Sequence, residues 1–131
     1  KPQGYYTYTL DKPLADKAKA QFYAHGIGTI CALDDGSLLL LEREFYVPHK
    51  KIGSFVNCKL FHLVPGKGDK QLLTQWRTSL TLTKRNIANY EGMCLGPKLK
   101  DGSRVLVLVA DSQDQYGGIL KDWIKTIRLY L

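Results

Sequence analysis

The stretch GIGTICALDDGSLLLLEREF, residues 26–45, decides the fold of this chain. It holds an apolar run, an Asp-Asp-Gly-Ser turn and a second run that begins with four leucines. Asp-Gly accepts the positive φ of a tight hairpin turn, so the stretch predicts two antiparallel strands joined by residues 34–37. The unbroken leucines indicate that the returning strand is buried on both faces.

The same pattern returns in the second half of the chain. Asp35-Gly36-Ser37 matches Asp101-Gly102-Ser103. Each turn follows a segment that contains a Gly and a Cys, and each precedes an aliphatic run that ends in an acid, Glu44 or Asp111. Asp-Gly turns are common, so two unrelated hairpins could each contain one by coincidence. Three matching features in the same order favour a repeat instead. Repeated units of short strands are typical of β-propeller blades.

The remaining apolar runs extend this repeat into a mainly antiparallel, all-β domain over residues 1–131. We expect two blade-like units of four and three strands, over about 26–80 and 88–131, with an N-terminal strand at 4–10 and a short helix within 14–24. A propeller ring usually needs about 4–8 blades. The chain is therefore expected to be a fragment of a larger propeller, or to cover its open edges by dimerising or with its N-terminal strand.

Length and composition are those of one globular domain. The chain has 131 residues, 44% hydrophobic and 24% charged. No apolar run approaches the roughly 20 residues that cross a bilayer. It begins with Lys and shows no signal peptide, so we expect a processed product or a fragment. Cys31, Cys58 and Cys94 form neither a disulfide framework nor a metal signature, and we expect all three to be small buried residues.

The formal net charge of +7 favours anionic partners such as phosphate esters, acidic glycans or nucleic acid. The lysines are scattered along the chain, and no RNP motif, zinc finger or basic helix is present. This distribution argues against nucleic acid and is typical of a solvated basic surface.

Charged and polar side chains stand where the apolar strands begin or end: Glu42, Arg43, Asn89, Glu91 and Asp111. Such groups need partners, because burying an unpaired charge is expensive. One hypothesis is structural: Arg43 pairs with Glu91 or Asp111 and locks adjacent blades together. The other is functional: Glu91 and Asp111 hold a cation such as Ca²⁺ or activate water, while Arg43 binds phosphate or carboxylate. In that hypothesis Glu42 and Asn89 also contact the ligand.

Signatures of several common enzymes are absent, among them GxSxG, HExxH, a phosphate-binding loop and an EF-hand loop. The histidines show no metal-ligand spacing. His25, which precedes the first inner strand, is the histidine that we expect near a cavity, as a candidate ligand-binding residue.

An ordered set of strings resembles the C-terminal part of a phytase-like domain, the "esterase-like activity of phytase" family. The strings are TLDKPLAD (9–16), GIGTICALDDGSLLLLEREF (26–45), NCKLFHLVP (57–65), NYEGMCLGPKLKDGSRVLVLVADSQ (89–113) and IKTIRLYL (124–131). The resemblance implies a propeller-like β fold, a secreted or periplasmic address and hydrolysis of esters or phosphoesters. The matching positions include every candidate named above except His25. The chain departs from the family at Ala110-Asp111-Ser112-Gln113, and the longer family domain implies that only the last blades are present.

Two functions therefore stay open at this point. The chain is a phytase-like hydrolase domain for anionic (phospho)esters, with partner chains of a homo-oligomer or missing N-terminal blades completing it. Alternatively, it is a non-catalytic propeller-like module for binding or structure, held by ion pairs between blades. The resemblance favours the first, and the short chain favours the second.

Overall fold

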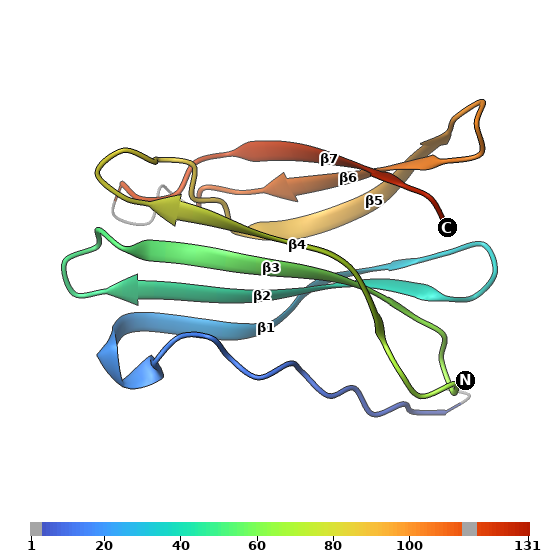
Figure 1. Cartoon of the computed structure of the whole chain (residues 1–131), viewed down its shortest axis with the longest axis horizontal. Coiled ribbons are helices and arrows are strands. Elements are labelled where there is room, and N and C mark those ends of the chain that lie inside the picture. The colour runs from blue at the N-terminus through green and yellow to red at the C-terminus, as the bar shows by residue number, and fades with distance from the viewer. Residues whose placement is uncertain (1–3, 114–117) are drawn as a thin grey trace.

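The computed structural model describes residues 4–113 and 118–131. In this part of the chain the strands are β1 (Ala20–Ala32), β2 (Leu38–Pro48), β3 (Ser54–Leu63), β4 (Gln71–Leu80), β5 (Tyr90–Lys98), β6 (Arg104–Ala110) and β7 (Trp123–Leu129). Strands β1–β4 form one antiparallel sheet in chain order, and β5–β7 form a second (Figure 1). The predicted all-β fold with a four-stranded and a three-stranded unit is confirmed.

The two Asp-Gly-Ser turns have the same geometry, which supports the sequence repeat. Gly36 and Gly102 have φ of 83° and 86°, a region that favours glycine. In each turn the serine hydroxyl donates to the preceding aspartate, at 2.5 Å for Ser37 and 2.6 Å for Ser103. Both serines are buried. The same hydrogen bonds therefore close the β1–β2 and β5–β6 hairpins.

The hydrophobic core lies between the two sheets. Leu41 and Leu60 of the first sheet and Leu106 and Leu108 of the second are fully buried there. Alternate residues of a strand point to the same side, so every second residue of β2 enters this core. The first strand of each sheet, β1 and β5, lies beside the other where the sheets meet. This face-to-face packing is the arrangement expected of adjacent blades.

Two local predictions about the N-terminal region are wrong. Residues 4–10 form no strand, because their polar groups bond to side chains of the sheet: Tyr8 donates to Glu42, and Thr9 accepts from Lys70. The helix expected within 14–24 is reduced to a single 3-10 turn, η1 (Lys17–Lys19), because β1 already begins at Ala20. Within the described residues, no helix is long and apolar enough to cross a bilayer.

One cysteine also differs from the expectation. Cys58 is buried in the core and Cys31 is half-buried, but Cys94 is exposed. The reason is strand alternation: Met93 and Leu95 pack against the core, which turns Cys94 to the outer face of β5.

Candidate functional site

Arg43 projects from the middle of β2 into the space between the two sheets. It shares the inward face of the strand with Leu41 and Phe45, which are buried in the core. Gly28 on β1 leaves room for the arginine side chain. A Cβ atom added there would stand 2.9 Å from Arg43 Cδ and 2.9 Å from the carbonyl oxygen of Tyr90. Because Gly28 on β1 has no side chain, the charged side chain of Arg43 on β2 has room to enter the core.

Two β-bulges lie beside this guanidinium. The pairing of β1 with β2 shifts register between Ile27 and Thr29, and that of β5 with β6 shifts between Tyr90 and Gly92. A bulge re-aims a side chain and is over-represented next to active sites. In β5 the extra residue is Glu91, and its carboxylate reaches the guanidinium between the sheets.

Arg43, Asn89 and Glu91 form a hydrogen-bonded group, here called the Arg43 cluster. Arg43 Nη1 donates to Asn89 Oδ1, and Arg43 Nη2 lies 3.2 Å from Glu91 Oε1. Asn89 Nδ2 donates to the same glutamate oxygen at 2.8 Å. The pairing of Arg43 with Glu91 that the structural hypothesis expected is confirmed. The side chains of Arg43 and Glu91 remain 23% and 34% exposed, so solvent reaches the cluster.

Gln113 connects the cluster to Asp111. Its side-chain amide donates to Glu91 Oε1 at 2.7 Å, and its backbone N–H donates to Asp111 Oδ1 at 2.9 Å. Its φ of 48° is uncommon for a residue other than glycine. Sequence reasoning missed Gln113, although its place two residues after a candidate carboxylate was a usable signal. The exposed Asp111 thus lies at the edge of the cluster.

The donors around Glu91 do not fit calcium. This ion takes about six to eight oxygen ligands. Glu91 Oε1 instead faces nitrogen donors of Arg43, Asn89 and Gln113. Within residues 4–113 and 118–131, no group of three or more His, Cys, Asp or Glu side chains is placed so that it could hold a metal ion. The positive charge at this site is the guanidinium of Arg43.

Glu42 lies on the opposite face of β2, where the N-terminal strap, residues 8–15, crosses the sheet. Its Oε1 accepts from the Tyr8 hydroxyl at 2.5 Å and from Lys70 Nζ. Its Oε2 accepts from the backbone N–H of Asp11 at 3.2 Å. Lys59 and Lys70 both pair with the Asp11 side chain, at 2.6 and 2.8 Å. Glu42 is 2% exposed and holds the strap, away from the Arg43 cluster.

Glu44, two residues along the same face, holds the other end of the strap. Its carboxylate accepts from the backbone N–H groups of Leu14 and Ala15, at 3.0 and 2.8 Å. It also accepts from the Tyr23 hydroxyl at 3.0 Å and from Asn57 Nδ2 at 3.0 Å. Sequence analysis used Glu44 only as the end of a repeated run. The buried side chain is instead a main anchor of the strap.

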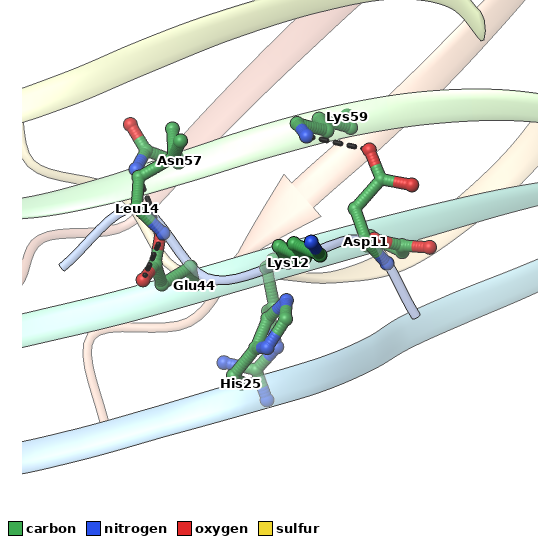
Figure 2. Close-up of a pocket in the computed structure, with 9 residues that line it drawn as sticks. Asp11, Lys12, Leu14, His25, Glu44, Asn57 and Lys59 are labelled. Carbon is green, nitrogen blue, oxygen red and sulfur yellow. Dashed lines mark hydrogen bonds and ion pairs between the residues drawn. The ribbon is translucent and has the colours of Figure 1, made fainter. Parts of the chain in front are cut away.

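His25 lines a cavity under the strap, together with Asp11, Lys12 and Glu44 (Figure 2). On β1 it stands opposite Glu44 in the strand register. The cavity volume is about 10 Å³, which holds about one water molecule. Of the predicted site residues, His25, Glu42 and Arg43 line this cavity, whereas Asn89 and Glu91 do not.

The strap carboxylates make stability depend on pH. Burial raises the pKa of Glu44, but the hydrogen bonds from Ala15, Asn57, Leu14 and Tyr23 together outweigh it, so the pKa is lowered. The pKa of Asp11 is also lowered, chiefly by Lys59 and then by Lys70. A lowered carboxyl pKa stabilises the folded state above the unfolded pKa of about 4, and this contribution is lost as pH falls.

We therefore expect the melting temperature to be nearly constant above about pH 5 and to fall steadily below about pH 4. Calorimetric scans across this range test the expectation. Glu44→Gln, which cannot titrate, should have a lower melting temperature at neutral pH and a shallower acid decline. An equal decline in the variant would assign the effect to other carboxylates.

Comparison with known proteins identifies one family. Residues 1–113 match the Phytase-like family, described as "Esterase-like activity of phytase". No curated protein and no solved structure matches the chain. The matched region includes both sheets except β7, and it includes every residue of the Arg43 cluster as well as Asp111 and Gln113. The match covers most of the sequence, and the chain belongs to the phytase-like family.

Proposed function

We propose that this chain is part of a phytase-like hydrolase domain that binds an anionic (phospho)ester at the Arg43 cluster. The observation that carries the proposal is the half-exposed pair of Arg43 and Glu91, set between two β-bulges where the blades meet. The family match supports a relationship to hydrolases of this kind. The planar guanidinium suits the oxygens of a phosphate or carboxylate.

In this proposal the ester anion replaces Glu91 as a partner of Arg43. The guanidinium then balances charge on the ester oxygens as water attacks. The released Glu91 carboxylate accepts a proton from that water, as a general base. Asn89 keeps the guanidinium in place through its side-chain oxygen. Gln113 and Asp111 stand at the open edge, where the leaving group would depart.

A second candidate function rests on a different feature of the same cluster. Glu91 Oε1 is engaged by Asn89 and Gln113 as well as by Arg43. A carboxylate with this many donors also serves well as a fixed link between blades. The chain would then be a binding or structural module, and the ion pair would contribute stability alone.

Two substitutions separate these functions. Glu91→Gln keeps the shape of the side chain but cannot accept a proton, so we expect turnover of 4-nitrophenyl phosphate or acetate to fall by about 100-fold or more. Arg43→Lys loses the planar fork, and we expect KM to rise by about tenfold. Asp69→Asn, an exposed change at the other end of the molecule, is the control.

Binding of inorganic phosphate, followed by NMR shifts of the Arg43 and Asn89 amides, tests the site independently of turnover. A chain that neither binds phosphate nor turns over either ester, and whose Glu91→Gln variant merely melts earlier, would favour the structural function. Turnover unchanged in Glu91→Gln would contradict the proposed general base.

The family resemblance also supports an extracellular or periplasmic address. In this proposal, further blades or other copies of this chain complete the propeller. Light scattering of the purified chain measures that association directly.

A further inference from the structure

The two ends of the molecule carry different turns. One end has the hairpin turns at 33–37, 64–70 and 99–103, which are rich in Gly and Asp as turns usually are. The other end, where η1 also lies, has the β2–β3 loop at 49–53 and the β4–β5 loop at 81–86 (left in Figure 1). These two loops, HKKIG and TLTKRN, contain no acidic residue. They are here called the basic tips.

The basic tips combine positive charge with exposed aliphatic side chains. Lys50, Lys84 and Arg85 are exposed. Ile52 and Leu82, at the turns themselves, are 53% and 82% exposed. Single exposed aliphatic residues are common. Here one stands on each of two neighbouring loops: Ile52 directly follows Lys51, and Leu82 lies two residues before Lys84.

The tips lie side by side and are held in shape. The backbone N–H of Gly53 donates to the carbonyl of Leu80 at 2.8 Å, which ties the first loop to the end of β4, directly before the second loop. Leu80 also forms a bridge with Arg85. Within the second loop, Thr81 N–H donates to the carbonyl of Lys84 at 2.7 Å, and Lys84 N–H donates to Thr81 Oγ1 at 2.9 Å. Little conformational freedom is therefore lost when these tips bind a surface.

We propose that the basic tips dock this chain onto an anionic lipid surface. Lys50, Lys84 and Arg85 would face the headgroups, and Ile52 and Leu82 would enter the boundary between headgroups and acyl chains. Charge alone fits any polyanion. The exposed aliphatic pair at the point of contact favours a surface with an apolar layer beneath its charge, which a soluble polyanion lacks. The inference is independent of the proposed hydrolase function.

The test is sedimentation of the full chain with phosphatidylcholine vesicles, with and without phosphatidylserine. We expect binding only to the anionic vesicles, weakening as salt rises because the surface charge is screened. Each basic residue near such a surface changes partitioning by about fivefold. Lys50→Glu/Lys84→Glu should therefore reduce binding by about tenfold or more. Ile52→Ser/Leu82→Ser should reduce it by about tenfold without changing net charge.

The matched control is Lys67→Glu/Lys100→Glu, which makes the same charge change on exposed residues at the opposite end. It should bind as the unmodified chain does. Equal loss in the control would show that net charge, not the basic tips, drives binding, and would overturn the proposal. Full binding by Ile52→Ser/Leu82→Ser, with heparin competing equally well, would overturn it in favour of a soluble polyanion. Absence of binding to anionic vesicles would overturn it outright.

Discussion

Glu44→Ala should release the N-terminal strap and destabilise the chain by about 3 kcal/mol. The carboxylate accepts from the backbone of Leu14 and Ala15 and from the side chains of Tyr23 and Asn57. Removing a buried acceptor leaves its donors unsatisfied, at about 1–3 kcal/mol for each one that water cannot reach. The strap donors regain water once the strap detaches. Asn57, 9% exposed inside the sheet, does so less easily.

Urea unfolding measures the change in stability, and hydrogen exchange locates it. In the variant we expect faster exchange at the amides of Leu14 and Ala15, with the core strands β2 and β3 still protected. Asp69→Ala removes a carboxylate from the surface and should change stability by less than about 0.5 kcal/mol. A loss below about 1 kcal/mol for Glu44→Ala, with the strap amides unaffected, would show that Glu44 is not the anchor.

The strands of this fold could be predicted because their signals are local. Asp-Gly turns flanked by aliphatic runs define the hairpins at 33–37 and 99–103, and the structure forms them with matching hydrogen bonds. The hairpin within 26–45 needed only strand propensity and turn chemistry, although its strands extend further, back to Ala20 and on to Pro48. Cys94 was misplaced because a register shift at Glu91 changes which residues of β5 face the core.

The strap could not be predicted, because its contacts are long-range and use side chains. Glu42 and Glu44 bond to residues that are about thirty positions earlier in the sequence. The alternation of two carboxylates within an otherwise apolar strand shows that partners are needed, but not which ones. For the candidate site, the sequence predicted a pair of Arg43 with either Glu91 or Asp111, and the structure forms the pair with Glu91. The sequence left open whether the pair is structural or functional. The geometry of the pair allows both hypotheses to be tested by substitution.

Gly28→Val should be as damaging as the loss of Glu44, for a steric reason. A Cβ atom at this position meets Arg43 Cδ and Nε at 2.9 Å and the carbonyl oxygen of Tyr90 at 2.9 Å. The arginine side chain could swing away, but the Tyr90 oxygen belongs to the backbone of β5. The two sheets would have to separate locally, so we expect a loss of about 3 kcal/mol, the upper part of the range for overpacking.

Gly26→Val on the same strand is the matched control, because an added Cβ there has no atom within 4 Å. Valine favours strands, so this control should be neutral or slightly stabilising. The double variant Gly28→Val/Arg43→Ala distinguishes the clash with the Arg43 side chain from the clash with the Tyr90 carbonyl oxygen. If the arginine were the main obstacle, the double variant would regain most of the stability, whereas contact with the Tyr90 carbonyl predicts that it stays unstable. Stability of Gly28→Val equal to that of Gly26→Val would contradict the close approach of β1 to β5, and with it the position assigned to Arg43 between the two sheets.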